Sequence, residues 1–310
     1  MKNYVRPAFL PNRHLETIYP SLFRKVDLYP YERVRIDTPD NDFLDLDFLR
    51  QGASQLIVIS HGLEGNTDRA YIKGMAKAFF DKGFDVLAWN YRGCSGEMNR
   101  QPRFYHSGAT EDLKTVIEYG YPNYKSISLI GFSLGGNLTL KFLGESSNSY
   151  KKISQAIVFS VPLDLHTSCL EIMKPFNWLY HQRFLKSLKA KVIQKSIQQP
   201  TIRIDDLNRI KTLMEFDNHF TAPIHGFASA IDYYTRCSSI YFLEAIQTNT
   251  LIVNAKNDPF LSQACFPNLK GHTFVKTESP QHGGHVGFAH FGGNRLYWSE
   301  LRALDFIIKT

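Results

Sequence analysis

The chain has 310 residues, of which 43% are hydrophobic, and this fits one large globular domain or a domain with an insertion. It contains no run of 18 apolar residues and no signal-peptide pattern, which argues against a transmembrane segment and favours a cytoplasmic protein. Its four cysteines lie far apart without a C-x-x-C pair, so we expect neither a disulfide framework nor a metal site.

The net charge of +7 is concentrated in one segment. Between Lys174 and Lys211, nine basic residues are opposed by only two acidic ones, and this excess of seven equals that of the whole chain. Because the remainder is nearly neutral, we expect no nucleic-acid partner. The basic segment could contact an anionic membrane surface, or it could be a lysine-rich face in water.

The predicted elements begin with an antiparallel hairpin of residues 33–37 and 43–50 that turns at residues 39–41. Apolar runs that are mostly continuous follow it, and they suit strands buried on both faces of a parallel sheet. These runs are Leu56–Ser60, Phe84–Trp89, Ile127–Ile130, Ala156–Ser160, Leu251–Ala255 and His272–Lys276. Helices are expected at Tyr71–Lys82, Ala109–Tyr119, Leu138–Glu145 and Leu296–Lys309. The alternation predicts a doubly wound α/β fold.

Residues 162–247 break this alternation. They contain a predicted helix over Trp178–Gln194 with an apolar stripe at every fourth residue from Tyr180. Since the segment leaves the sheet between two core strands, we expect an inserted helical cap over the edge where ligands bind. The core then comprises residues 1–161 and 248–310. Trp178, Tyr180 and Phe184 are expected to help enclose an apolar substrate pocket.

The sequence GFSLGG, residues 131–136, lies between a predicted strand and a predicted helix. Strand, G-x-S-x-G and helix together are typical of the nucleophile elbow of a serine hydrolase. The glycines allow strand and helix to approach closely at a sharp bend, so that the Ser133 hydroxyl is exposed above the sheet. Ser133 is therefore the candidate nucleophile.

A serine hydroxyl needs a base, and the base needs an acid to orient it, in the chain order Ser, Asp or Glu, His. Asp258 follows the strand Leu251–Ala255 at its carboxyl end, whereas the neighbouring Asn257 cannot carry the required charge. Among the histidines after the last strand, His285 in a glycine-rich loop is the preferred base. His282 is its rival, and His272 is assigned to the strand itself.

The developing oxyanion of acyl transfer needs backbone donors. One is expected to be the N–H of Leu134, directly after the nucleophile, and the other the N–H of Leu63 in the loop after residues 56–60. His61 in that loop precedes the nucleophile, so a structural role is expected for it rather than that of the base.

Further motifs extend the pattern over nearly the whole chain. They are residues 12–18 (NRHLETI), 61–74 (HGLEGNTDRAYIKG), 90–96 (NYRGCSG), 105–108 (YHSG), 131–137 (GFSLGGN), 216–217 (FD), 225–227 (HGF), 233–234 (YY), 257–260 (NDPF) and 283–288 (GGHVGF). Together they resemble the YheT-like branch of the α/β-hydrolases, which is related to eukaryotic membrane-associated abhydrolase-domain lipases.

This resemblance implies an α/β-hydrolase fold, a Ser133–Asp258–His285 triad and hydrolysis of carboxylic esters. The chain departs from the family pattern at two positions. Asn257 stands where an acid precedes the aspartate, and Glu16 stands where a glutamine is expected.

Three matched residues have more than one interpretation. Arg92 and Asp217 could bind substrate or belong to a buried ion pair that holds loops near the cap. His225 could line the pocket or belong to the core.

The predicted function is that of a serine esterase or lipase-like enzyme that forms an acyl-enzyme with a small-molecule ester and needs no cofactor or metal. A thioesterase or an amidase would use the same groups. The alternative from another class is a non-catalytic ligand-binding or scaffold protein on a hydrolase fold. The natural substrate and the oligomeric state are not readable from the sequence.

Overall fold

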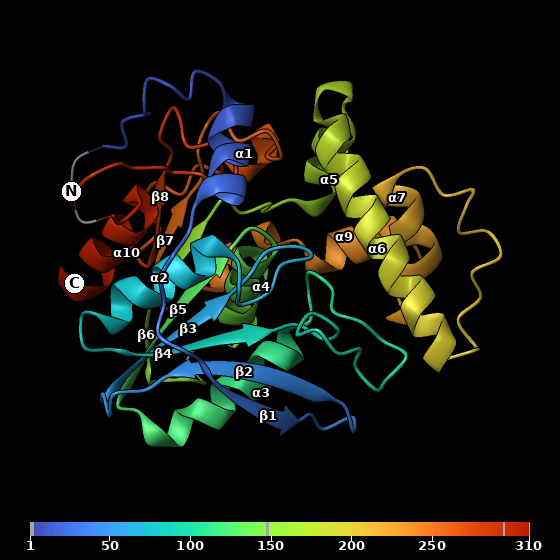
Figure 1. Ribbon diagram of the computed structural model, residues 1–310, viewed down its shortest axis with the longest axis horizontal. Coiled ribbons are helices and arrows are strands. Elements are labelled where there is room, and N and C mark those ends of the chain that lie inside the picture. Colours follow the sequence, from blue (N-terminus) through green and yellow to red (C-terminus); the bar gives the residue numbers. More distant parts are fainter. Residues whose placement is uncertain (1–2, 147–148, 294, 310) are drawn as a thin grey trace.

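The computed structural model describes residues 3–146, 149–293 and 295–309, and its centre is one eight-stranded sheet (Figure 1). The strands are β1 Glu32–Asp37, β2 Phe43–Leu49, β3 Gln55–Ser60, β4 Asp85–Asn90, β5 Ser126–Phe132, β6 Ile153–Phe159, β7 Asn249–Val253 and β8 Val275–Glu278. Their spatial order is β1-β2-β4-β3-β5-β6-β7-β8. β2 pairs antiparallel with β1 and β4, and the five other neighbouring pairs are parallel. The predicted hairpin and mostly parallel sheet are confirmed.

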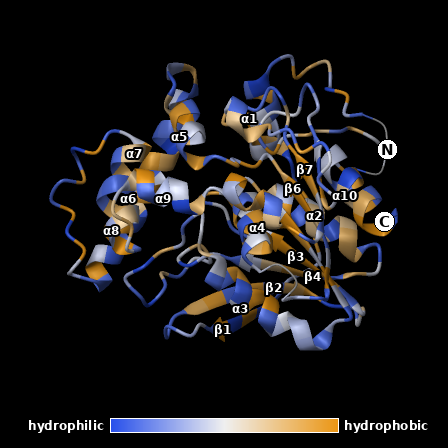
Figure 2. Ribbon diagram, turned by 180° about the vertical axis from the view of Figure 1, so that it is seen from behind, coloured by the Kyte–Doolittle hydropathy of each residue, from blue (hydrophilic) through white to orange (hydrophobic). Residues whose placement is uncertain are grey.

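The core strands are buried on both faces. Along β3, Leu56 and Val58 pack into one apolar cluster while Ile57 and Ile59 pack into another, and none is more than 1% exposed. Successive side chains of a strand point to opposite faces, so a continuous apolar run suits a sheet that is covered on both sides. Figure 2 shows these hydrophobic strands in the interior.

Helices cover both faces of the sheet. α2 (Ala70–Phe80) and α10 (Trp298–Lys309) pack on one face, and α3 (Thr110–Gly120) and α4 (Leu134–Glu145) pack on the other. These four helices were predicted from the sequence. α4 begins earlier than expected, directly after Ser133, because the glycines at its start belong to the helix rather than to a loop.

Outside residues 162–247, the helix α1 (Arg13–Phe23) is missing from the sequence prediction. Asn12 caps it, since its side chain accepts hydrogen bonds from the N–H groups of His14 and Leu15, both at 3.0 Å. Pro20 lies inside the helix and removes one backbone donor, which hides the helical pattern in the sequence. In the part of the chain that the structure describes, no helix is long and apolar enough to cross a membrane.

The assignment of His272 to the last strand is wrong. β8 begins at Val275, and His272 lies in the turn before it. Its Nδ1 accepts hydrogen bonds from the N–H groups of Phe274 (3.1 Å) and Val275 (3.0 Å). A side chain that bonds to its own turn competes with the strand ladder, so the strand starts later.

Residues 162–247, called the cap segment below, contain helices and turns between β6 and β7 (Figure 1). The helices are α5 Leu165–Met173, α6 Trp178–Gln198, α7 Leu213–Phe216, α8 Ala222–Ile224 and α9 Ala230–Cys237. Their buried side chains form an apolar cluster that also includes Met98 and Phe104. The cap segment therefore packs against the long connection after β4; its standing as a separate domain remains a prediction.

The basic residues of the cap segment do not form one exposed face. Lys195 is 0% exposed, and its Nζ donates to the carbonyl oxygens of Asn99 (2.5 Å) and Gln101 (2.7 Å). Lys191 pairs with Glu64 at 2.7 Å. These two lysines connect α6 to the core, so they do not belong to a lysine-rich face in water or to a membrane-contacting surface. Membrane contact through the other basic residues stays a prediction.

Candidate active site

Ser133 occupies the sharp turn between β5 and α4. Its φ of 53° and ψ of −121° lie in a region that residues other than glycine rarely adopt. The turn is held by the N–H of Ser133, which donates to Phe159 O at 2.9 Å, and by its carbonyl, which accepts from the N–H of Gly136 at 2.9 Å. Strain that is held in this way is common at functional sites.

Two glycines let the elbow form. A Cβ on Gly131 would lie 2.6 Å from Gly135 O. A Cβ on Gly135 would lie 2.5 Å from the carbonyl oxygens of both Ser60 and His61. A side chain at either position would therefore force the strand, the helix and the loop after β3 apart.

The structure brings the three predicted catalytic side chains together. His285 Nε2 lies 2.9 Å from Ser133 Oγ, and His285 Nδ1 lies 2.9 Å from Asp258 Oδ2. Asp258 is buried beyond the end of β7, where its Oδ1 also accepts from the N–H of Phe260 at 2.9 Å. A histidine that donates from Nδ1 to a carboxylate can accept a proton at Nε2. The arrangement can therefore activate the serine hydroxyl as a nucleophile.

His282, the rival base, lies outside this chain of hydrogen bonds. Its side chain is 42% exposed, and its Nδ1 lies 3.8 Å from Glu16 Oε1. The geometry favours His285 as the group that can receive the Ser133 proton.

The loop that carries His285 is held by side chains from distant parts of the chain. Three successive N–H groups donate: Gly283 to Glu16 Oε2 (2.5 Å), Gly284 to Asn257 Oδ1 (3.1 Å) and His285 to Thr17 Oγ1 (2.9 Å). Glu16 and Thr17 belong to α1, so the unpredicted helix positions the candidate base.

Glu16 and Asn257 also contact each other. Glu16 is buried, and its Oε1 accepts from Asn257 Nδ2 at 2.9 Å. These are the two positions at which the chain departs from the pattern of the family that it resembles. Position 16 has an acid where an amide is expected, and position 257 has an amide where an acid is expected. The reciprocal departure is the sequence signal that could have revealed the contact.

Leu63 and Leu134, whose N–H groups are expected to hold an oxyanion, border the same cavity as Ser133. Within residues 3–146, 149–293 and 295–309, no hydrogen bond from the N–H of Leu63 or Leu134 is found. Leu134 opens α4, where the first N–H groups have no partner inside the helix. Both groups can therefore donate to a ligand; their service as an oxyanion hole remains a prediction.

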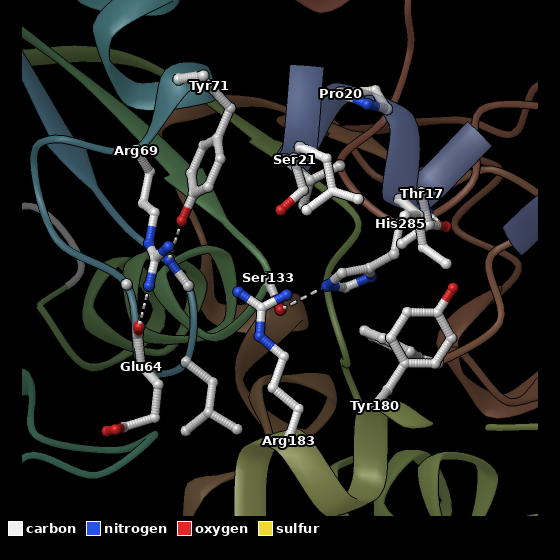
Figure 3. Close-up of a pocket in the computed structure, with 18 of the residues that line it drawn as sticks. Thr17, Pro20, Ser21, Glu64, Arg69, Tyr71, Ser133, Tyr180, Arg183 and His285 are labelled. Carbon is white, nitrogen blue, oxygen red and sulfur yellow. Dashed lines mark hydrogen bonds between the residues drawn. The ribbon is translucent and has the colours of Figure 1, made fainter. Parts of the chain in front are cut away.

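Two cavities meet at Ser133 and His285. The larger cavity, of about 220 Å³, is bordered by α1, α6 and the loop after β3 (Figure 3). The smaller cavity, of about 130 Å³, is bordered mainly by the cap segment and by residues 105–107. Phe260 borders both cavities, and its ring centroid lies 4.3 Å from that of the His285 ring.

Of the three aromatic residues predicted to enclose a pocket, two border these cavities. Tyr180 borders the larger cavity, and Phe184 borders both. Trp178 borders neither and is 58% exposed, so the prediction for this residue needs correction. Trp178 lies two residues before Tyr180 at the start of α6, and residues two apart on a helix face nearly opposite directions.

His61 has the structural role expected for it. Its Nδ1 donates to Gly62 O at 2.8 Å, and its Nε2 accepts from the N–H of Tyr91 at 3.3 Å. Burial lowers the pKa of His61 to about 3, so the ring is neutral.

Arg92 and Asp217 do not pair with each other. Arg92 is buried and pairs with Asp42 (2.9 Å) and Asp112 (2.7 Å), which supports the ion-pair interpretation for the arginine. Asp217 borders the smaller cavity, and its Oδ2 accepts from the Tyr234 hydroxyl at 2.6 Å. Burial raises the pKa of Asp217 to about 6.

His225 belongs to the packing between the cap segment and the core. Its Nδ1 donates to Thr221 O at 2.7 Å, and its Nε2 accepts from the N–H of Phe104 at 3.2 Å. It borders neither cavity at Ser133.

Comparison with known proteins agrees with the fold. A family described as "alpha/beta hydrolase fold" matches residues 55–290. A relative in Escherichia coli (strain K12), named "Putative esterase YheT", is 36% identical over 96% of this chain and 90% of its own length. The "Phospholipase ABHD3" of Bos taurus is 27% identical over 88% of this chain and 70% of its own length. The chain thus belongs to the α/β hydrolase fold family, among its esterase- and lipase-type enzymes, as the sequence predicted.

Solved structures share the fold at low identity. The esterase Pf2001 of Pyrococcus furiosus matches with a TM-score of 0.60 and 17% identity, covering 100% of this chain and 97% of that one. The structure of ferulic acid bound to Est1E from Butyrivibrio proteoclasticus matches with a TM-score of 0.60 and 14% identity, covering 89% and 98%. These likenesses support the sheet and helix arrangement.

Proposed function

We propose that the protein cleaves carboxylic esters with an acyl or lipid-like part, and that Ser133, His285 and Asp258 form its catalytic triad. The observation that carries this proposal is the 2.9 Å contact of His285 Nε2 with Ser133 Oγ at a strained elbow. The two cavities that meet at this contact offer one space on each side of a scissile bond.

In the first half of the reaction, Ser133 Oγ attacks the carbonyl carbon while its proton moves to His285 Nε2. The N–H groups of Leu63 and Leu134 stabilise the oxyanion, and Asp258 stabilises the imidazolium. Collapse of the tetrahedral intermediate breaks the bond to the alcohol, and His285 donates its proton to the departing oxygen. The products are the alcohol and an acyl-enzyme on Ser133.

In the second half, water attacks the acyl carbonyl and gives a proton to His285 Nε2. The same N–H groups stabilise the new oxyanion. When the bond to Ser133 breaks, His285 returns the proton to Oγ and the carboxylic acid leaves. Every proton in this cycle is carried by the side chains named, so the proposed cycle needs no further group.

The cap segment covers one side of the nucleophile in this proposal. Phe184 and Leu188 from α6, with Leu165 from α5, border the smaller cavity. Such apolar walls suit an acyl chain, since apolar surface gains free energy when it leaves water. We therefore assign the acyl part of the substrate to the smaller cavity.

Hydrolysis of p-nitrophenyl esters of increasing acyl length tests the proposal, with the Ser133→Ala variant as control. We expect turnover by the wild-type protein that the variant loses. Thioesters and anilides with the same acyl groups separate ester hydrolysis from thioesterase and amidase activity. Equal rates for wild type and variant would reject the serine mechanism.

The alternative, a non-catalytic binding or scaffold protein, predicts a different outcome. It requires that no ester is turned over and that a fluorophosphonate leaves Ser133 unmodified. The hydrogen bond from Ser133 to His285 argues for the enzyme, because it activates the hydroxyl toward both reagents.

A further inference from the structure

The larger cavity is bordered by two exposed arginines for which the described residues supply no carboxylate partner. Arg183 from α6 and Arg69 at the start of α2 both border this cavity, and Figure 3 shows their side chains directed into it. Among the described residues neither arginine forms an ion pair. The polar contact of Arg69 is a hydrogen bond from Nη2 to Glu64 O at 3.0 Å.

The acidic side chain in the same cavity is already engaged. Glu64 pairs with Lys191 at 2.7 Å and accepts a hydrogen bond from the Tyr105 hydroxyl at 2.6 Å. A third arginine of the lining, Arg24, pairs with Glu300 at 2.7 Å. The charge left for a ligand in this cavity is therefore positive, and it comes from Arg69 and Arg183.

The smaller cavity has the opposite character. Of the described residues that border it, none is an arginine or a lysine. The carboxyl group of Asp217, which borders this cavity, accepts hydrogen bonds from the hydroxyl groups of Tyr234 and Thr221. The nucleophile thus lies between an apolar space and a cationic one.

We propose that the substrate carries an anionic group, a carboxylate or a phosphate, on its alcohol part, and that Arg183 and Arg69 bind this group in the larger cavity. The inference rests on the proposed function, which places the acyl part in the smaller cavity. Guanidinium groups suit both anions because their planar N–H donors match two oxygens at once. The arginines would determine which ester is preferred and not the chemical step, because the bond cleaved at Ser133 is the same in charged and neutral esters.

A pair of esters of equal shape tests this assignment. In 4-carboxyphenyl butanoate the leaving group is anionic, and in 4-carbamoylphenyl butanoate it is neutral. The wild-type protein should have the higher kcat/KM on the anionic ester, and Arg183→Gln should lower the ratio of the two values by roughly tenfold to hundredfold, the usual range for a lost charge-assisted hydrogen bond. Arg69→Gln should lower it less, because its guanidinium is shared with Glu64 O.

The matched control is Lys186→Gln, which removes one exposed positive charge from the same helix without touching either cavity. It should leave the ratio unchanged, which separates a local subsite from general attraction of anions. A butanoate ester with a phosphate at the same ring position distinguishes the two anions. Equal losses on the charged and neutral esters in Arg183→Gln, or a wild-type preference for the neutral ester, would overturn the proposal.

Binding of an uncleavable analogue separates this inference from the proposed function. Calorimetry with the ether 4-butoxybenzoate, which has no acyl bond to cleave, and with its neutral carboxamide should show tighter binding of the anion to the wild-type protein, and Arg183→Gln should remove the difference. This readout needs no turnover, so it holds even if Ser133 proves inactive. Equal affinity of the wild-type protein for the two compounds would reject the anionic subsite.

Discussion

Ser133 Oγ in the elbow and His285 Nε2 in its loop lie 2.9 Å apart, but the elbow and the loop are built in different ways. The elbow consists of consecutive residues whose backbone hydrogen bonds and missing Cβ atoms shape the turn. The loop is held by Glu16, Thr17 and Asn257, whose side chains come from far along the chain. A nucleophile can thus be recognised from a short motif, whereas the position of its base depends on tertiary contacts.

The largest effect is expected from Ser133→Ala, which removes the proposed nucleophilic oxygen from the elbow and leaves the glycines intact. We expect kcat for ester hydrolysis to fall by roughly 10⁴–10⁶-fold. Because the substitution deletes only a partly exposed hydroxyl, the thermal unfolding midpoint should change little. Stopped-assay kinetics and calorimetry measure the two quantities; activity close to wild type would contradict the assignment.

Removing the base should be nearly as damaging. His285→Ala should lower kcat by roughly 10³–10⁶-fold, because the serine then lacks a proton acceptor. His282→Ala is the matched control, since its ring lies in the same loop region but outside the chain of hydrogen bonds to Ser133. We expect a mild effect for that variant, and the reverse ranking would assign the base to His282.

Gly135→Ala tests whether the elbow depends on close backbone approach. The added Cβ would meet two carbonyl oxygens at 2.5 Å, so we expect the free energy of unfolding to fall by about 1–3 kcal/mol, together with a loss of activity. Gly293→Ala is the control, because a Cβ there meets no atom within 4 Å. Chemical denaturation compares the two variants, and equal stability would show that the elbow tolerates a side chain.

The Glu16–Asn257 contact tests the loop. Glu16→Gln alone sets two amide donors against each other, and Asn257→Asp alone sets two carboxylates against each other. We expect each variant to lose about 1–3 kcal/mol of stability and roughly tenfold in kcat. When both substitutions are combined, the new amide at position 16 can donate to the new carboxylate at position 257 and still accept from the N–H of Gly283, so the hydrogen bonds between the two positions and to Gly283 and Gly284 are restored.

A double-mutant cycle measures this compensation through kcat and the unfolding free energy. We expect the double variant to recover most of what each single variant loses. Additive losses would show that the two side chains do not position the His285 loop as a unit.

Much of the fold was predictable because its strands are continuous apolar runs and its helices alternate with them. Outside the cap segment, the differences from the prediction arise where one residue opposes the pattern: Pro20 lies inside the missed helix α1, and His272 delays the start of β8. At the site, Ser133, Asp258 and His285 could be proposed from motif and chain order. Glu16 and Thr17 could not, because their role depends on where a distant helix packs.

The pocket was the least predictable part. Periodicity places Tyr180 and Phe184 on one face of α6 and Trp178 on the opposite face, so the prediction that grouped all three did not follow the helical spacing. The buried lysines show the same limit. Lys195 has the same local surroundings in the sequence as an exposed lysine, and only the carbonyl groups of residues 99 and 101 explain its burial.

The most direct test of the central claim is the intact mass of the protein quenched in acid during turnover of a p-nitrophenyl ester. The proposed mechanism predicts an increase equal to one acyl group, located on Ser133 by peptide mapping, in the wild-type protein and none in Ser133→Ala. An acyl group on another residue, or ester turnover by Ser133→Ala at the wild-type rate, would contradict the assignment of Ser133 as the nucleophile.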